Sequence, residues 1–567
     1  MVLSIDEGAA QLLKRRSVLS FKYQYLHRKF PSQNSNKEFV NVKMEKTRKM
    51  SESKLLFVRE SSGLVKEVNT GFALLLPIAL TLGPWFAYGG PQISTWFAGA
   101  HLTAMFAIGS FTVFFEALAL MCLMLSMPRS GASYYFTGRG LSPIFGVMEG
   151  WRSVITNPVF RGTGSFLAVQ VFAGGLYVLG SAAGDAGLVA LGAFLSTPLP
   201  LFAFAAATIF IGFIFGYLSV KWLGWFVIIL GLVNIMAILV ADVAMLTTPL
   251  NATNWDAVFG VGNYATIAAL NPTSGLGAYL NFSWGAVGPA LILTVGMMWP
   301  YLIMPVAGEV AQPSKNIPIS NLGGWLGIAV FFILSGYAAE SSMGAFLYQN
   351  NLANMAGAGG IFPGWGNYAA VALKGGVAGW FVVLSPIYAS ILDSPSNALW
   401  VTRPFHSMAM DRFCPEVFAS VHPKYHVPHV SLYFWLILAM GTLTYATLLQ
   451  AFFGTALSAL VGVGYTYIFI RWQMALAAVG LPYYRPTLWE RSGAWKILGI
   501  PLISLGGIVS GVVFFWAIVA YTPGLPYEVA FTVFVYLWGQ LMYMYYGAKN
   551  KAKGIEISAI FGQLPPE

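Results

Sequence analysis

The chain has 567 residues, of which 57% are apolar and 9% are charged, and its net charge is +10. Ordinary soluble domains carry about 25% charged residues. The composition therefore excludes a string of soluble domains and indicates a multi-pass membrane protein.

Residues 1–68 form a polar tail that holds 14 of the 31 Lys and Arg residues. A mixed-charge segment with few apolar residues cannot build a core, so we expect this tail to be disordered and cytoplasmic. We expect no cleavable signal peptide, since the first apolar run is too long and too internal.

About twelve apolar segments are long enough to cross a bilayer, which takes about 20 residues. They are continuously apolar rather than alternating, and this predicts an all-α bundle of 12 transmembrane helices instead of a barrel. The segments lie at roughly 71–90, 101–126, 154–180, 199–218, 223–246, 285–307, 322–341, 376–397, 429–450, 453–477, 497–521 and 527–547.

The first segment contains Leu82, Gly83, Pro84 and Trp85 near mid-membrane. Proline removes one helical hydrogen bond and clashes with the carbonyl four residues earlier. In lipid, such an interruption is tolerated where the freed backbone faces protein or a water-filled cavity. We predict a helix break here, with an ordinary proline kink as the alternative.

The second and third segments each carry an ionisable residue at membrane depth. Glu116 lies 12 residues before Pro128 and Arg161 lies 10 residues after Trp151, which places them about 18 and 15 Å deep at a rise of about 1.5 Å per residue. Isolated charges are costly in a membrane, so we predict that the two side chains pair. The alternative is a titrating Glu116 in a proton path.

The sixth segment repeats the proline feature in the run Met298, Trp299, Pro300 and Tyr301. With the N-terminus inside, this helix runs opposite to the first. Two interrupted helices five segments apart predict an inverted 5+5 repeat, with residues 69–246 and 285–477 as its halves. Two further helices at 497–547 and a cytoplasmic tail at 548–567 complete the expected organisation.

The paired breaks predict a ligand site. Half-helix termini present amide groups to an anion and carbonyl groups to a cation, which suits a zwitterion. The candidate substrate-binding residues are therefore Leu82, Gly83, Pro84, Trp85, Met298, Trp299, Pro300 and Tyr301. The aromatic residues among them are expected either to enclose an apolar or cationic substrate side chain, the latter through cation–π contact, or to serve as packing residues.

The distribution of basic residues predicts orientation and argues against nucleic acid as a partner. With the N-terminus in the cytoplasm, the Lys and Arg residues of the loops and tails fall on the cytoplasmic side, and the outer loops contain one cation, Lys374. This is the positive-inside bias, and it places both termini in the cytoplasm.

Three loops on the same predicted face carry signatures. They read PRSGASYY at 128–135, GEVAQPSKNIP at 308–318 and RPFHSMAMDR at 403–412. These loops resemble the Pro-x-Ser-Gly-Gly-x-Tyr, Glu-x-x-x-Pro-x-x-x-x-Pro and Arg-x-x-x-x-Met-Ala-Arg-Asp-Gly loops of the amino acid–polyamine–organocation (APC) transporters. The resemblance covers roughly residues 70–550.

The resemblance implies a leucine-transporter-like fold, alternating access and substrate bound at the two breaks. It departs from the family in the first helix. Family members commonly have a Gly-x-Gly stretch there, whereas this chain has Gly83 followed by Pro84. Family members also often have a Gly-aromatic pair where this chain has Trp299 and Tyr301 beside Pro300.

In related folds, helix 8 and the broken first helix hold a coupling sodium ion or a charge that replaces it. The eighth segment here supplies Asp393, Ser394 and Ser396. Their oxygens suit sodium, and a buried carboxylate can equally carry a proton. The ion-coupling candidates are these three residues and Glu116, with a helix-end cap or a structural hydrogen bond as the alternative for Asp393.

The signature loops also suggest gating pairs. Glu309 with Lys315, and Asp411 with Arg403, are expected to form cytoplasmic latches that hold one access state closed. The alternative is an ordinary loop salt bridge, which contributes little to stability.

No catalytic constellation, metal-ligand spacing or phosphate loop is present in the sequence. We expect no enzyme activity, no cofactor and no metal. The sequence predicts a secondary transporter of amino acids or related amines in the cell membrane, surrounded by lipid and coupled to H⁺ or Na⁺ or working by exchange. A polyamine or nucleobase transporter, or a non-transporting sensor on the same scaffold, remains the alternative.

Overall fold

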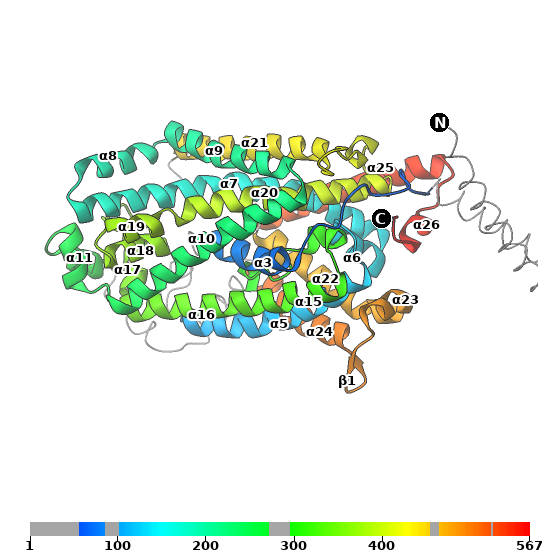
Figure 1. Ribbon diagram of the computed structural model, residues 1–567, viewed down its shortest axis with the longest axis horizontal. Helices are drawn as coiled ribbons and strands as arrows, with labels where there is room; N and C mark the ends of the chain where they lie inside the picture. The colour runs from blue at the N-terminus through cyan, green and yellow to red at the C-terminus, as the bar shows by residue number, and fades with distance from the viewer. Residues whose placement is uncertain (1–55, 85–100, 271–294, 454–463, 523–525, 567) are drawn as a thin grey trace, which may run out of the picture. The chain divides into compact units, whose positions relative to one another are not determined.

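The computed structural model describes residues 56–84, 101–270, 295–453, 464–522 and 526–566. The chain divides into two compact units, Met1–Leu56 and Phe57–Glu567, and every element named below belongs to the second. This unit is mostly helical, and its long helices run roughly side by side (Figure 1).

The longer helices follow the predicted segments in chain order. They are α3 (Thr70–Pro84), α5 (Leu102–Ser126), α7 (Pro143–Ala183), α9 (Pro198–Tyr217), α10 (Val220–Thr247), α16 (Gly324–Met343), α20 (Ser385–Met410), α21 (His429–Phe453), α22 (Gly464–Tyr484), α24 (Leu502–Tyr521) and α25 (Pro526–Ala552). Within the described ranges, eight helical stretches are long and apolar enough to cross a membrane. The count of twelve and the inverted repeat stay predictions, because parts of the first, sixth and tenth segments lie outside the described residues.

Short elements connect these helices. They are α6 (Ala132–Gly140), α8 (Ala186–Leu195), α11 (Ala252–Phe259), α12 (Asn263–Ala269), η3 (Met304–Glu309), α15 (Pro313–Pro318), η4 (Ile319–Gly323), α17 (Phe346–Met355), α18 (Trp365–Ala372), α19 (Gly376–Val383), η5 (Glu416–Ala419), α23 (Pro486–Trp489), η7 (Glu490–Ser492) and α26 (Ile557–Gly562). The strands β1 (Lys496–Ile497) and β2 (Ile500–Pro501) form an antiparallel hairpin in which Lys496 pairs with Pro501 and Ile497 with Ile500.

Helix α7 begins earlier than the predicted third segment. It spans 41 residues from Pro143, with Ser142 as its N-cap and proline in its first turn, where the missing amide hydrogen costs no helical bond. Residues 143–153 therefore belong to the helix and not to the preceding loop. Arg152 lies inside α7 and is buried.

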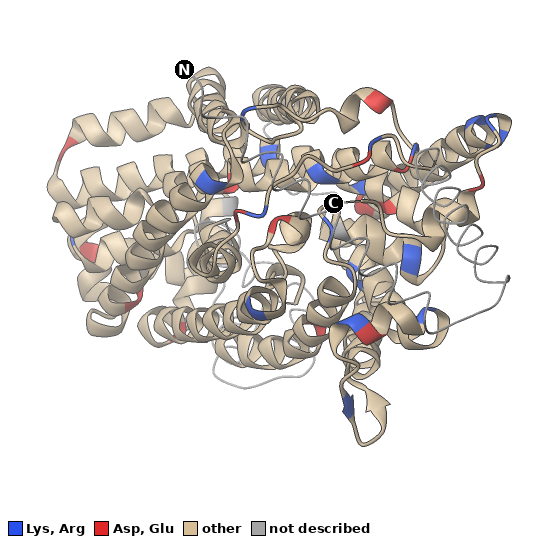
Figure 2. Cartoon of the chain, turned by 45° about the vertical axis from the view of Figure 1, so that its right-hand side comes forward, with Lys and Arg blue, Asp and Glu red and all other residues tan. Residues whose placement is uncertain are grey.

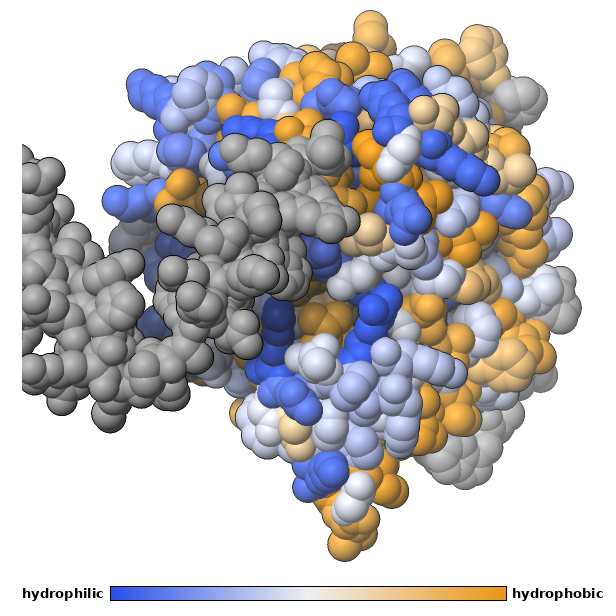
Figure 3. Space-filling model, turned by 90° about the vertical axis from the view of Figure 1, so that its right-hand side faces the viewer, coloured by the Kyte–Doolittle hydropathy of each residue, from blue (hydrophilic) through white to orange (hydrophobic). Residues whose placement is uncertain are grey.

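The charged residues are unevenly distributed along the bundle. Figure 2 shows most Lys and Arg residues toward the end that carries the C-terminus and α26. Figure 3 views this end directly and shows hydrophilic residues over much of it, with apolar residues toward the edges. We call it the C-terminal face.

The sixth segment is interrupted at the predicted position. Helical structure stops at Met297, residues 298 and 299 are irregular, turns occupy 300–303, and η3 follows. Helix α3 is described as far as Pro84, and Trp85 lies outside the described residues. The segments flanking the two predicted breaks meet at a parallel bridge, in which Val68 N donates to Glu309 O and Ala311 N donates to Val68 O, each at 3.0 Å.

Candidate functional site

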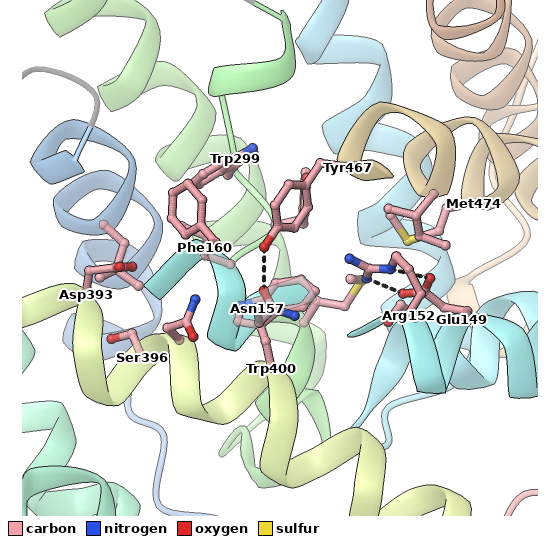
Figure 4. A pocket seen from close by; sticks show the side chains of 17 residues that line it. Glu149, Arg152, Asn157, Phe160, Trp299, Asp393, Ser396, Trp400, Tyr467 and Met474 are labelled. Atoms are coloured by element: carbon pink, nitrogen blue, oxygen red, sulfur yellow. Dashed lines mark hydrogen bonds and ion pairs between the residues drawn. The ribbon is translucent and has the colours of Figure 1, made fainter. Parts of the chain in front are cut away.

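A cavity lies beside the interrupted sixth segment, among α3, α6, α7, α20 and α22 (Figure 4). It is lined by Leu80, Ser133, Glu149, Arg152, Asn157, Phe160, Trp299, Tyr301, Leu302, Met304, Asp393, Ser396, Asn397, Trp400, Tyr467, Ile470 and Met474. Of the predicted substrate-binding residues, Trp299 and Tyr301 line it.

Aromatic rings form the wall of this cavity nearest the break. Phe160, Trp299 and Tyr467 contact one another with centroid separations of 5.9 to 6.0 Å. Tyr301 meets Trp400 edge-to-face at 6.2 Å. These are favourable aromatic geometries, so the wall is a packed cluster as well as a contact surface.

Polar groups complete the cavity, and two of them are already held by hydrogen bonds. Tyr467 Oη donates to Asn157 Oδ1 at 2.7 Å, and Asn157 Nδ2 donates to Ser153 O at 2.7 Å. Trp435 Nε1 donates to Asn397 Oδ1 at 2.9 Å. These bonds fix the orientation of the two amide side chains.

A local ion pair lies at one side of the cavity. Arg152 donates to Glu149 through Nε at 2.8 Å and Nη2 at 2.5 Å, and Nη1 donates to Thr156 Oγ1 at 3.1 Å. The two residues are three positions apart on α7, which brings their side chains to one helix face. Figure 4 shows this pair at the opposite side of the site from Asp393. This pair was not predicted, because the predicted third segment begins at residue 154, after both residues.

Asp393 lines the cavity and pairs with Arg161 of α7. Arg161 Nη1 donates to Asp393 Oδ2 at 2.5 Å, and Nη2 donates to Ser390 Oγ at 2.9 Å. The predicted pair of Glu116 with Arg161 is therefore wrong. Depth along a helix does not say which neighbouring helix a side chain faces.

Glu116 instead pairs with Arg471 of α22, which the sequence analysis did not single out. Arg471 Nε donates to Glu116 Oε1 at 2.7 Å, and Arg471 Nη2 donates to Glu116 Oε2. Both side chains are buried. The signal was present in the sequence, since an arginine inside an apolar segment is itself a functional candidate.

Arg471 also binds the interrupted helix. Its Nη1 donates to Val295 O, and its Nη2 donates to Met298 O at 3.1 Å. Two further carbonyls at the break have donors: Trp299 Nε1 donates to Gly296 O at 2.6 Å, and Thr81 Oγ1 donates to Trp299 O at 3.4 Å. The carbonyls freed by the interruption are thus largely satisfied by protein.

The remaining described candidates near the breaks do not line the cavity. Leu82 is buried, and Gly83 lies against Ala389 of α20 and Asn234 of α10. Met298 Sδ accepts a hydrogen bond from Ser110 Oγ at 3.7 Å. Pro300 begins the turn that follows the irregular residues.

The two other candidate coupling residues on α20 differ from each other. Ser396 lines the cavity, and its hydroxyl donates to Leu392 O at 3.2 Å. Ser394 lies against Gly212 of α9 and is not among the lining residues. The structure thus separates Ser394 from the site where the sequence grouped it.

Both predicted gating pairs have the wrong partners. Glu309 accepts from Arg403 Nη2 at 2.8 Å and Nε at 3.0 Å, and also from Ser130 Oγ at 2.9 Å. Lys315 is exposed in α15. The interaction therefore joins the loop after the broken helix to α20, not to its own loop.

Asp411 pairs with Arg139 of α6 and not with Arg403. Arg139 Nη2 donates to Asp411 Oδ2 at 2.7 Å, and Tyr134 Oη donates to the same oxygen at 2.8 Å. Burial raises the pKa of the nearby Cys414 thiol well above its ordinary value. The Glu309–Arg403 pair joins the second and third signature loops, and Ser130 and Tyr134 of the first loop donate to Glu309 and Asp411, so all three loops are connected at the C-terminal face.

Comparison with known proteins identifies the family. The model of the amino acid permease family matches residues 93–549. The chain is also 24% identical over 511 residues to the glutamate/serine transporter AimA of Bacillus subtilis (strain 168), and the match covers 87% of this chain and 83% of the relative. The resemblance drawn from the three loops is thereby confirmed, and the protein is a transporter rather than an enzyme. This multi-pass membrane protein belongs to the amino acid permease family of the APC superfamily.

Proposed function

We propose that the chain is a secondary active transporter of amino acids or closely related amines in the cell membrane, working by alternating access. The observation that carries this proposal is the cavity beside the interrupted sixth segment, with charged groups at opposite sides and aromatic rings between them. Ligand sites at broken helices are typical of inverted-repeat transporters.

The chemistry of the cavity supports a small zwitterion as substrate. Asp393 and Glu149 offer acceptor oxygens for an ammonium group, and Arg152 offers donors for a carboxylate. The aromatic wall suits either an apolar or a cationic substrate side chain. The relative's name states glutamate and serine, and at 24% identity we carry over only the class of amino acids.

Leu82, Gly83, Pro84, Trp85, Met298 and Pro300 remain in the proposal as the backbone around the site. The carbonyls of Val295, Gly296, Met298 and Trp299 already have donors. Direct recognition is therefore assigned mainly to side chains, with Trp299 and Tyr301 as the predicted residues that reach the cavity.

The two buried pairs at the C-terminal face support a gating role. They join α6, η3 and α20, so opening this face requires that both pairs break. We propose that the state described is closed at this face, that the face is cytoplasmic, and that Glu309, Arg403 and Asp411 act in the gate. Lys315 has a peripheral role at most.

We favour a different set of coupling residues from the set predicted from the sequence. Arg161 beside Asp393 and Arg471 beside Glu116 supply permanent counterions. These ion pairs favour a structural role over a coupling role for Asp393 and Glu116. Ser396 stays a candidate because it lines the cavity, whereas Ser394 would need another conformation to reach it.

Uptake into proteoliposomes tests the proposal. Labelled amino acids, polyamines and nucleobases are offered separately, under imposed proton or sodium gradients and in exchange mode. We expect at least one amino acid to accumulate or exchange, with polyamines and nucleobases excluded. A Trp299→Ala variant should bind the transported amino acid with lower affinity. The control variant Glu556→Gln, at an exposed position, should transport like the wild type. If correctly folded protein moves none of these compounds, the transport proposal fails.

A further inference from the structure

Within the described part of the chain, all buried acidic side chains but one pair with an arginine. Six acids are buried: Glu116, Glu149, Asp242, Glu309, Asp393 and Asp411. Five of them pair with an arginine, namely Arg471, Arg152, Arg403, Arg161 and Arg139. Asp242 alone among the six has no cation partner within the described residues.

Asp242 lies on α10 and faces α16. Ser335 Oγ of α16 donates to its Oδ2 at 2.6 Å, and Oδ1 has no hydrogen-bond partner among the described residues. The residue is 1% exposed. The carboxyl group is therefore held by one hydroxyl, with its second oxygen directed into the protein and unused.

Other ionisable groups on the packing elements do not neutralise it. Helix α10 packs against α3, α9, α16, α18, α19 and α20, and α3 and α19 contain no Asp, Glu, His, Lys or Arg. Glu340 of α16 pairs with His101, and Asp393 of α20 pairs with Arg161. The remaining groups on these elements and on α10 itself are Tyr217, Lys221, Tyr337, Tyr368, Tyr388, Arg403 and His406, none of which forms an ion pair with Asp242 in the described structure.

An unpaired carboxylate is very costly in a low-dielectric interior. Two species can remove the charge, a metal cation or a proton. Sodium-type sites need several oxygen ligands, and the described contacts of Asp242 consist of the single Ser335 hydroxyl. A proton needs only one oxygen, and Oδ1 is available for it.

A second polar residue connects this position to the proposed substrate site. Asn234 lies eight residues before Asp242 on α10, is 1% exposed, and neither of its amide atoms has a partner among the described residues. It lies beside Gly83, at the predicted break of α3. Helix α3 contacts both α10 and α16, so a rearrangement of α3 would act on the two helices that carry Asp242 and Ser335.

We propose that Asp242 is the residue that binds and releases a coupling proton, an inference that rests on the transport function proposed above. The proton adds to Oδ1 of the carboxylate and forms the neutral acid, while Ser335 continues to donate to Oδ2. Release to the opposite side of the membrane breaks the same O–H bond and restores the carboxylate. One proton thus moves with each conformational cycle, and no other reactant is needed.

The transport test compares Asp242→Asn with Glu556→Gln, an exposed acid that serves as control. Asparagine has nearly the shape of the neutral acid and cannot release a proton. We expect Asp242→Asn to retain substrate exchange at equal pH and to lose accumulation driven by a proton gradient. Accumulation at the wild-type level in Asp242→Asn would overturn the inference. Absence of exchange in the wild type would instead overturn the transport proposal.

Infrared spectroscopy supplies a measurement that does not depend on transport. The difference spectrum between wild type and Asp242→Asn should show one carboxylic acid carbonyl band that titrates with pH. Ser335→Ala should shift the band, because it removes the hydroxyl that donates to the same group. Absence of a titrating carbonyl band from this difference spectrum would refute the proton site even if the variant is inactive in both transport assays.

Discussion

Arg471 has two roles in the structure, and its removal should show both. It neutralises Glu116 and it donates to two carbonyls of the interrupted helix, Val295 O and Met298 O. The informative perturbation is therefore a pair of single variants, Arg471→Met and Glu116→Gln. If Arg471 were only a counterion, the two variants would cost similar amounts.

The magnitudes follow from the contacts. Removing one partner of a buried ion pair costs about 3–5 kcal/mol, and this cost applies to Arg471→Met, which leaves Glu116 charged and alone. Each carbonyl left without a donor adds about 1–3 kcal/mol, so the two carbonyls add about 2 kcal/mol or more. Glu116→Gln leaves the guanidinium bonded to both carbonyls and keeps an amide oxygen as acceptor. We therefore expect Arg471→Met to be the more destabilising change by at least about 2 kcal/mol.

The assay is equilibrium unfolding in mixed micelles, followed by tryptophan fluorescence, with the exposed Arg491→Met as a control for loss of charge. Hydrogen exchange in the same samples should show faster exchange at residues 295–303 in Arg471→Met than in Glu116→Gln. Equal destabilisation by the two variants, or a larger effect of Glu116→Gln, would refute the role of Arg471 in holding the break.

Three further outcomes are expected. A Cβ at Gly162 would lie 2.6 Å from Ala439 O, so Gly162→Ala should destabilise the protein by about 1–3 kcal/mol through overpacking. The control is Gly441→Ala, whose new methyl group has nothing within 4 Å. It should be neutral or stabilising in the same unfolding assay. The buried Cys414 thiol, whose pKa is raised by burial, should react slowly with maleimide at neutral pH, and Arg139→Gln should accelerate the reaction by loosening the C-terminal face; an unchanged rate would contradict the gating role of that pair. Trp299→Ala removes a ring that lines the proposed substrate cavity. If that ring contributes about 1.4 kcal/mol to substrate binding, the KM for uptake should rise about tenfold with a smaller change in maximal rate, and an unchanged KM would place the substrate elsewhere.

Local features of the sequence predicted the positions of the long helices, the interruption of the sixth segment and the family. Length and continuous apolarity located the membrane segments, because each is a property of about 20 neighbouring residues. Pro300 predicted the interruption that is seen at residues 298–303, because a proline lacks the amide hydrogen whatever surrounds it. The three loop signatures predicted the family, which the family match confirms.

Helix starts were less predictable, and one error had consequences. The segment expected from residue 154 begins at Pro143, because Glu149, Arg152 and Ser153 interrupt the apolar run just before residue 154. The Glu149–Arg152 pair lies before residue 154, so this pair was not predicted either. A capping interpretation of Ser142 followed by Pro143 would have recovered the pair.

The partners of the charged residues were decided by the tertiary structure. Composition showed that Glu116, Arg161, Asp393, Glu309 and Asp411 needed partners, since buried charges are not left alone. Yet the observed pairs join positions 94 to 355 residues apart, and every predicted pairing was wrong. A sequence specifies which side chains each helix carries and roughly how deep they lie. Which of them meet depends on the rotation of each helix about its axis and on which helices become neighbours, and both are set by packing across the whole bundle.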